Sequence, residues 1–462
     1  MGQTPADSAV AADVALPRLI PGGSVDGYYA WMIVATALVL MMTTPALALF
    51  YGGMSRSKSV LNMMMMSYLA LGIIGIVYVL WGWSMAFAGD DVAGLFGNPF
   101  DAWALKDVPW SSYIGGVMFQ MTFAAITVAL ISGAIADRVK MSAWIIFVPI
   151  WATLCYFPIS HQVWATGTGF VSKHFAAQDY AGGTVVHINA GVAGLVLALI
   201  IGKRVGFGKE PMRPHNLTLT MIGAGLLWFG WYGFNVGSMV FVAGDGAAKD
   251  IDQFMTETGV TFLNTTIATC AAMLGWLLME RILHGKATSL GAASGIVAGL
   301  VAITPACGAV NLTGAIVIGI AAGVLCAWAV GLKYKVGMDD SLDVVGVHLV
   351  GGLVGTLLIG LLSTASAPGG IDGLFYGGGF DSLIDQAGAA GWTILWTGTL
   401  TTILALIIKY TIGWRISAEA EVEGIDSDQH SESAYDLHSG LGAGPTSGSV
   451  LAGSHVSEGA NA

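Results

Sequence analysis

Long apolar segments separated by short polar ones make up almost the whole chain. Each apolar segment has about 18 residues or more, the length of a helix that crosses the hydrocarbon core of a bilayer. The pattern predicts eleven spans, at about 29–50, 60–88, 113–136, 141–159, 183–202, 217–240, 258–283, 288–305, 310–331, 341–363 and 390–412. The alternating ten-residue segments of a membrane barrel are absent, so we expect an all-α membrane protein.

The composition agrees with this fold class and excludes a soluble globular domain. Of the 462 residues, 55% are hydrophobic and only 10% are charged, and the mean hydropathy is +0.73. The 65 glycines suit helices that pack closely in lipid. The net charge of −11 is concentrated in residues 416–462, which hold eight acidic residues and no Lys or Arg. No basic cluster supports nucleic-acid binding.

Basic residues set the expected orientation, because loops rich in Lys and Arg stay in the cytoplasm. With eleven spans and the N-terminus outside, 14 of the 18 basic residues fall in inner loops or at the inner end of the last span. We therefore expect a multi-pass protein of the plasma (inner) membrane with a cytoplasmic C-terminus. Residues 1–27 lack the pattern of a cleavable signal peptide and are expected to form an extracytoplasmic leader.

One motif occurs in two copies. In each copy an Asp precedes a His by eight positions, and glycines follow the His at four and seven positions. The first copy holds Asp179 and His187 at the start of span five, and the second holds Asp340 and His348 early in span ten. Spans 1–5 and 6–10 therefore form an inverted 5+5 repeat, with a shared site near the midplane and an eleventh helix bracing one flank.

The two histidines are the first candidates for chemistry. A lone buried histidine is usually bonded to a backbone carbonyl, but matched histidines inside membrane spans favour function. A metal centre needs three or four ligands, and no Cys or carboxylate recurs at ligand spacing around both copies. The pair is better suited to a small neutral polar solute or to proton transfer. Asp179 and Asp340 are expected to cap helix ends, and Asp179 could also stabilise a bound cation through space.

Aromatic residues form the second set of candidates, since an outer Trp beside a hydroxyl can bind a small cation and phenyl rings below it exclude water. The candidates are Phe119 and Phe123 in span three, Trp231, Phe234 and Ser238 in span six, and Trp164 in an outer loop. An aromatic belt at the membrane interface is the common alternative. It accounts poorly for Phe123, which lies in the middle of a span.

These motifs resemble the ammonium transporter family (Amt/Mep, related to the Rhesus proteins) over about 25–436. The similar segments are Asp-Tyr-Ala-Gly-Gly from 179 with His187, Phe-Gln-Met-Thr-Phe at 119–123, Gly-Trp-Tyr-Gly-Phe-Asn at 230–235, Thr-Pro-Ala-Cys-Gly at 304–308, and Asp-Asp-Ser-Leu-Asp-Val-Val-Gly-Val-His at 339–348. The segment from 423 to 435 is also similar to the family's cytoplasmic C-terminal region.

The resemblance implies a role for each candidate. The implied roles are an outer ammonium site of Trp164 and Ser238 with Phe119 nearby and Asp179 in support, a gate of Phe123 and Phe234, and a pore of His187, His348 and Trp231. It also implies a homotrimer with one pore in each subunit and, as in bacterial members, a PII-type signalling protein at the cytoplasmic face. The domain organisation expected is a membrane domain over 28–415, a cytoplasmic regulatory segment over 416–436 and a disordered tail over 437–462.

The function expected is ammonium transport, with no catalytic activity and no cofactor. Ammonium would lose its proton at the outer site and ammonia would cross the pore, because a bare cation meets a large desolvation penalty in an apolar channel. Separate proton transfer would make transport electrogenic. An electroneutral gas channel and an ammonium sensor signalling through the tail are the alternatives, and an intramembrane enzyme with a His–Asp site is less favoured because no nucleophile accompanies it.

Overall fold

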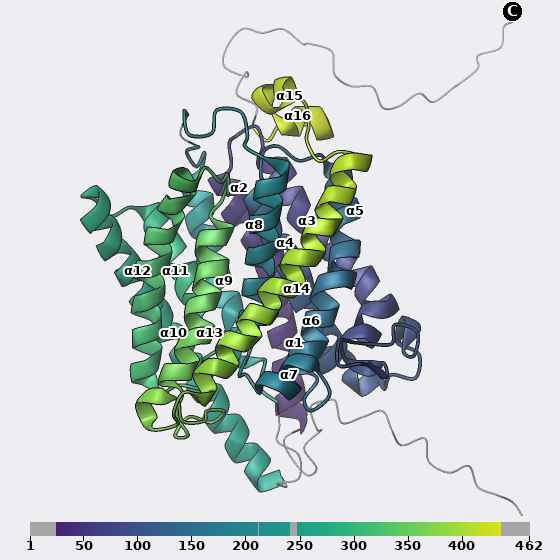
Figure 1. Cartoon of the computed structure of the whole chain (residues 1–462), viewed down its shortest axis with the longest axis vertical. Helices are drawn as coiled ribbons and strands as arrows, with labels where there is room; N and C mark the ends of the chain where they lie inside the picture. Colours follow the sequence, from purple (N-terminus) through teal and green to yellow (C-terminus); the bar gives the residue numbers. More distant parts are fainter. Residues whose placement is uncertain (1–24, 211, 241–246, 436–462) are drawn as a thin grey trace, which may run out of the picture.

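The computed structural model describes residues 25–210, 212–240 and 247–435, most of them in helices that run roughly along one direction (Figure 1). The predicted disordered tail at 437–462 and all but the last three residues of the predicted leader at 1–27 lie outside the described residues. The short segments α15 and α16 lie at one end of the bundle, which is the predicted inner end. The opposite end is the predicted outer end.

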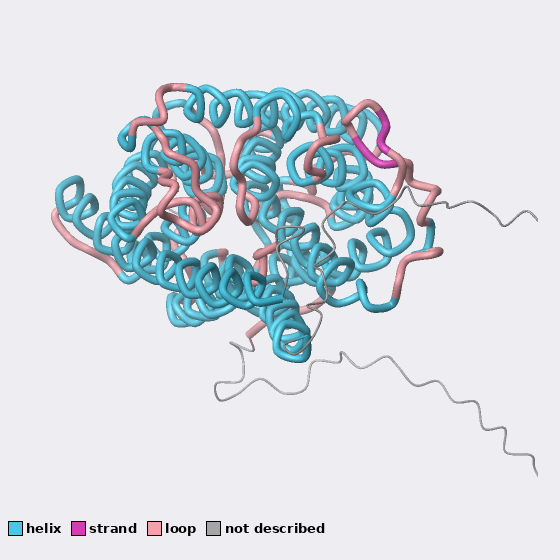
Figure 2. The backbone as a smooth tube through the Cα atoms, turned by 90° about the horizontal axis from the view of Figure 1, so that it is seen from below, coloured by secondary structure: helices cyan, strands magenta, loops and turns pink. Residues whose placement is uncertain are grey.

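The first repeat unit consists of helices in which α-helical segments alternate with short π- or 3-10-helical segments, labelled η. Its elements are α1 Val25–Met41, η1 Met42–Leu47, α2 Ala48–Met54, α3 Val60–Val77, η2 Tyr78–Gly82, η3 Ser84–Ala88, η4 Trp103–Leu105, η5 Trp110–Ser112, η6 Tyr113–Met118, α4 Phe119–Ile131, η7 Ser132–Ile135, α5 Met141–Trp151, η8 Ala152–Tyr156, α6 Phe157–Trp164, α7 Phe170–Phe175, η9 Gly183–Ile188 and α8 Asn189–Ile201. A two-stranded antiparallel hairpin, β1 (Asp91–Val92) and β2 (Phe96–Gly97), lies at the periphery (Figure 2).

The second repeat unit is followed by one long helix and the C-terminal segment. The elements are α9 Leu217–Val236, α10 Ala247–His284, α11 Ser289–Ile303, α12 Leu312–Val336, η10 Val345–Leu349, α13 Val350–Leu362, η11 Leu374–Tyr376, α14 Asp381–Thr411, α15 Ala418–Glu423 and α16 Ile425–His430. Of the eleven predicted spans, ten correspond to described helices that are long and apolar enough to cross a membrane. The eighth is the shorter α11, so a multi-pass helical protein is established while the count of eleven stays a prediction.

Glycines of the duplicated motif allow the two repeat units to meet backbone to backbone. A Cβ at Gly191 would lie 2.5 Å from the backbone N of Leu349, and a Cβ at Gly352 would lie 3.2 Å from the backbone N of Ile188. Each glycine follows its own His by four positions and packs on the residue next to the other His. This reciprocal packing is the local signature of the inverted repeat, because a pseudo-two-fold axis exchanges the two contacts.

The last long helix, α14, crosses the bundle obliquely on one face (Figure 1) and is tied to the first unit by polar side chains. Trp151 Nε1 donates to Thr401 Oγ1 at 2.9 Å, and Thr397 Oγ1 donates to Asn189 Oδ1 at 2.8 Å. All four residues are buried. Hydrogen bonds between spans hold an otherwise apolar helix pair in one register, which is the bracing role expected for the eleventh span.

The C-terminal segment of residues 416–435 lies against loops at the predicted inner end. Asp426 accepts the backbone N–H groups of Leu61 at 3.0 Å and Asn62 at 2.7 Å, at the start of α3. Glu421 is completely buried and accepts from Arg415 at 2.6 Å and from the backbone N of Val205 at 2.5 Å. The segment is therefore attached to loops of the first repeat unit by buried acidic side chains.

Candidate functional site

The two motif histidines lie next to each other in the interior of the molecule. His187 lies in η9 and His348 in η10, and the π-helical turn at each position widens the helix where the imidazole projects. Their Nδ1 atoms are 3.3 Å apart, and both residues are almost completely buried. One Nδ1 must donate the shared proton and the other must accept it, so the tautomer of one histidine determines the tautomer of the other. His187 Nε2 is buried without a protein partner among the described residues.

A stack of phenyl rings lies next to the histidines. Phe123 of α4 and Phe234 of α9 lie face to face, with ring centroids 4.0 Å apart and planes inclined by 10°. Both rings are almost completely buried. Phe234 is 6.3 Å from the His187 ring. The Trp231 ring lies nearly parallel to His187 at 5.6 Å. The predicted gate and pore residues therefore form one column of rings.

A cavity of about 560 Å³ continues this column to the predicted outer end. Trp164, Ser238 and Asp179 all line it, and the Trp164 ring meets Phe123 edge-on at 6.0 Å. Ser238 Oγ donates to the backbone oxygen of Phe234 at 2.8 Å, which leaves its lone pairs available to accept from a ligand. Phe119 does not line the cavity. Its ring packs behind Phe123 at 4.9 Å.

Asp179 uses its carboxylate to cap η9, as expected. Its oxygens accept the backbone N–H groups of Gly182 at 2.7 Å, Gly183 at 2.6 Å and Thr184 at 2.8 Å, as well as the Thr184 hydroxyl. Its backbone oxygen accepts from Trp164 Nε1 at 2.9 Å. A helix N-terminus has free N–H groups and a partial positive charge, which a carboxylate satisfies. Asp179 thus links the cavity Trp to the helix that carries His187.

The same capping contact recurs in the second copy of the motif. Asp340 accepts the backbone N–H groups of Val344 at 3.0 Å and Val345 at 2.8 Å, at the start of η10. Lys333 Nζ donates to the backbone oxygen of Asp340 at 2.8 Å. The Lys333 ammonium also pairs with Asp343 at 2.5 Å. The two copies therefore share the cap and differ in the ion pair beside it. Among the described residues, no group of three or more His, Cys, Asp or Glu side chains could hold a metal ion.

Comparison with known proteins identifies the family. The Ammonium Transporter Family model matches residues 30–435. The chain belongs to the ammonium transporter family. An ammonium transporter of Mycobacterium bovis is 53% identical, and the match covers 94% of this chain and 93% of that protein. An ammonium transporter of Aquifex aeolicus is 46% identical over 89% of this chain and 94% of its own length. Saccharomyces cerevisiae Mep2 superposes with a TM-score of 0.75 at 31% identity, covering 88% of this chain and 90% of Mep2.

Membership of the ammonium transporter family makes the chain a transporter rather than an enzyme. It also agrees with the ten candidate spans in the described residues, which make this a multi-pass membrane protein. Family membership therefore supports ammonium or ammonia as the transported species.

This ammonium transporter also contains site residues that the sequence did not single out. Trp231 Nε1 donates to Thr304 Oγ1 at 2.8 Å, and Thr304 also lies 3.2 Å from Asn235 Oδ1. All three residues are buried, so the hydrogen bonds fix the Trp231 ring beside His187. A signal was present, because Thr304 begins the Thr-Pro-Ala-Cys-Gly segment and Asn235 ends the Gly-Trp-Tyr-Gly-Phe-Asn segment.

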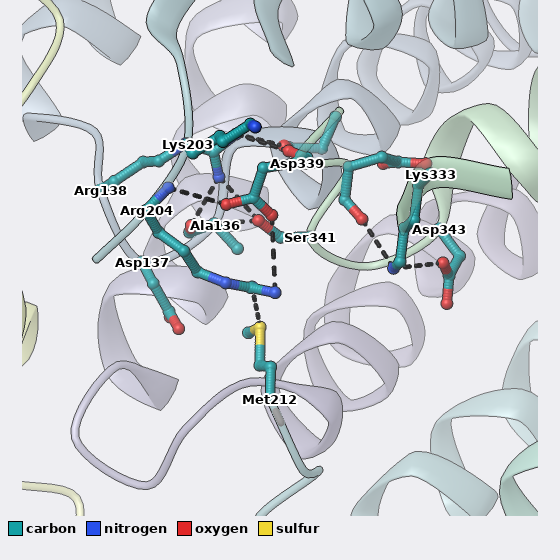
Figure 3. A network of polar contacts seen from close by, with 12 residues as sticks. Ala136, Asp137, Arg138, Lys203, Arg204, Met212, Lys333, Asp339, Ser341 and Asp343 are labelled. Carbon is teal, nitrogen blue, oxygen red and sulfur yellow. Dashed lines mark hydrogen bonds and ion pairs between the residues drawn. The ribbon is translucent and has the colours of Figure 1, made fainter. Parts of the chain in front are cut away.

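A buried ionic network at the predicted inner end was also missed (Figure 3). Arg138 donates to the backbone oxygen of Asp339 at 2.7 Å and to Ser341 Oγ at 2.6 Å. Arg204 NH2 lies 3.5 Å from Asp339 Oδ1. Arg138 and Arg204 belong to the first repeat unit, whereas Asp339 and Ser341 precede η10 of the second. The network therefore joins the two units beside the start of η10, the segment that carries His348.

Proposed function

We propose that the chain recruits ammonium in the outer cavity, removes its proton there, and conducts ammonia past the phenyl stack and the two histidines. The supporting observation is the continuous column of rings from Trp164 through Phe123 and Phe234 to His187. In this proposal Trp164 attracts the cation through its π face, Ser238 accepts one of its N–H groups, and Asp179 adds negative potential. Phe119 backs the gate from behind.

Energetics favour ammonia over ammonium as the permeating species. The Phe123–Phe234 stack and the histidine pair are buried, and moving an unpaired ion into such surroundings costs several kcal/mol or more. Ammonia is neutral, and it can donate to or accept from His187 Nε2, which has no protein partner in the described part of the chain. Trp231, held by Thr304, forms the wall opposite the imidazole.

The proton left behind by ammonium crosses separately in this proposal. The Nδ1 atoms of His187 and His348 are 3.3 Å apart, within reach of a proton transfer between two imidazoles. Joint tautomer exchange would move one proton along the pair without placing ammonium in the pore. Transport would then carry net charge, unlike that of an electroneutral gas channel.

The experiment that tests this function records ammonium-induced current and ammonia flux in liposomes containing the purified protein. We expect both signals, with a current well above that of empty liposomes. The His187→Ala variant is expected to keep ammonia flux while its current falls about tenfold (about 1.4 kcal/mol in barrier), because His348 loses its proton partner.

The outcomes separate the alternatives. Flux without current in the wild-type protein would establish the electroneutral channel and sink the electrogenic proposal. Absence of both would sink ammonium transport by the purified chain. An unchanged current in His187→Ala would show that the proton takes a path outside the histidine pair. A matched His348→Ala variant should behave as His187→Ala does, since the two imidazoles act as one unit.

We also propose that the protein is a homotrimer of the inner membrane, with its N-terminus outside and its C-terminal segment in the cytoplasm, where a PII-type protein binds. The clustering of basic residues at one end and the attachment of residues 416–435 there support this orientation. Light scattering of the purified protein should give the mass of three chains. Adding a PII protein should lower transport by at least half, and a monomer or an unaffected rate would contradict the respective proposal.

An ammonium sensor is the second candidate function. Residues 416–435 contact loops near spans one, three and five, which gives the pore a mechanical connection to the cytoplasmic segment. A solved structure described as a sensor Amt protein superposes with a TM-score of 0.77 at 26% identity, covering 87% of this chain and 98% of its own. A variant lacking 416–462 that transports normally but no longer signals would support this dual role.

A further inference from the structure

The outer cavity holds two acidic side chains with different hydrogen-bond partners. Asp179 and Glu257 both line it. The Asp179 oxygens already accept three backbone N–H groups at 2.6 to 2.8 Å and the Thr184 hydroxyl. A carboxylate offers about four acceptor positions, so Asp179 is saturated by its helix. It contributes potential to the cavity and has little capacity left to bind a ligand directly.

Glu257, on α10, is partnered much less fully. Its Oε1 accepts from the Tyr180 hydroxyl at 2.7 Å and its Oε2 accepts from Gln253 Nε2 at 2.9 Å. The residue is only 5% exposed, although it lines the cavity. Two donors leave about two acceptor positions of the carboxylate unused. A buried anion with unused acceptor positions is costly unless a cation or further donors reach it.

The surroundings hold the Glu257 carboxylate in one place. Burial raises the pKa of Tyr180 well above its ordinary value, so the phenol keeps its proton and donates it to Glu257. The Tyr180 backbone N donates to Pro305 O at 3.2 Å. Its ring also packs on Gly308, where a Cβ would lie only 2.5 Å from Tyr180 Cε2. The segment 304–308 thus positions the tyrosine that occupies one acceptor position of the carboxylate.

We propose that Glu257 is the direct counter-charge for the cation in the outer cavity, accepting N–H groups of ammonium before its proton is removed. This proposal rests on the proposed function and names its specificity-determining residue. The ligand class is a small monovalent cation that carries N–H donors. A focused negative potential raises the local concentration of such a cation, and the unused carboxylate positions replace part of the water that it loses.

The test measures the ammonium dependence of transport in liposomes for the wild type, Glu257→Gln and Asp252→Asn. Glutamine keeps the shape of Glu257 and its side-chain oxygen can still accept from the Tyr180 hydroxyl, so the variant removes the charge and at most the hydrogen bond from Gln253. Asp252 lies five positions earlier on α10 and is exposed, so its substitution removes the same charge from the surface. We expect Glu257→Gln to raise KM about tenfold with Vmax within twofold of the wild type, and Asp252→Asn to leave both unchanged.

Tyr180→Phe is the second variant, and we expect it to change KM in the opposite direction to Glu257→Gln. It removes one donor and leaves the charge, so the carboxylate should bind the cation more strongly and KM should fall about threefold. If Glu257→Gln does not reach the membrane in folded form, Tyr180→Phe decides alone, and a raised KM overturns the proposal. An unchanged KM in a folded Glu257→Gln variant, or a loss confined to Vmax, also overturns it. Absence of wild-type transport would instead sink the proposed function itself.

Discussion

Replacing Asp179 by alanine is expected to remove most ammonium transport and to destabilise the folded protein by about 3 kcal/mol. The carboxylate accepts the N–H groups of Gly182, Gly183, Thr184 and Val185 and the Thr184 hydroxyl, and alanine removes all of these acceptors. Without it, the N-terminus of the helix that carries His187 is left unsatisfied next to a membrane-spanning core. The loss should appear as a lower midpoint of thermal unfolding in detergent and as a lower Vmax in liposomes.

Two control variants make the Asp179 result interpretable. Asp179→Asn keeps one acceptor oxygen and should recover part of the stability, in line with the good capping ability of asparagine. Asp340→Ala removes the matched cap of the second copy, where only the N–H groups of Val344 and Val345 are held, so its cost should be smaller. A stability of Asp179→Ala equal to that of the wild type would contradict the capping role. Equal losses of stability in Asp179→Ala and Asp340→Ala would contradict the expectation that the cap with more hydrogen bonds contributes more stability.

Much of this architecture could be predicted because it repeats along the sequence. The copies around His187 and His348 imply the inverted units, and the spacing of Gly191 and Gly352 allows the close crossing that brings the histidines within 3.3 Å at Nδ1. Local spacing also identifies the caps, since Asp179 reaches N–H groups three to six positions ahead. Features that depend on period and on near neighbours can be predicted from one sequence.

Features that depend on distant pairings could not be predicted. Tyr180 and Glu257 are joined by one hydrogen bond across 77 positions, and neither residue type is unusual in its own segment. Arg138 meets Asp339 across 201 positions, and each is an ordinary charged loop residue by sequence alone. The helix α11 has only 15 residues, which rise about 22 Å. This is shorter than the hydrocarbon core of a bilayer, about 30 Å, so length alone does not identify α11 as a span.

The inner network carries the second large prediction, made for Arg138. This guanidinium is completely buried and donates to backbone oxygens of Ala134 at 3.0 Å, Gly202 at 3.0 Å and Asp339 at 2.7 Å. Burial lowers its pKa to about 10, so it remains ionised at neutral pH. Replacing Arg138 by alanine removes one donor from each of these oxygens and from Ser341 Oγ, and Ala134 O keeps the backbone N–H of Ser341 at 3.4 Å. We expect a loss of about 4 kcal/mol, because removing one partner of a buried charged network is strongly destabilising.

Thermal unfolding in detergent measures the Arg138→Ala effect, with two variants for comparison. Arg138→Lys keeps the charge but lacks the planar fork of donors, so it should recover less than half of the loss. Lys140→Ala is the surface control, since its ammonium makes one exposed contact with Ile412 O at 3.2 Å, and its effect should stay below about 0.5 kcal/mol. If Arg138→Ala lowered the stability no more than Lys140→Ala does, the network would make no net contribution to the stability. An Arg138→Ala variant that loses the whole of this stability should also transport less ammonium. Arg138 holds the loop that precedes η10, and η10 places His348 against His187.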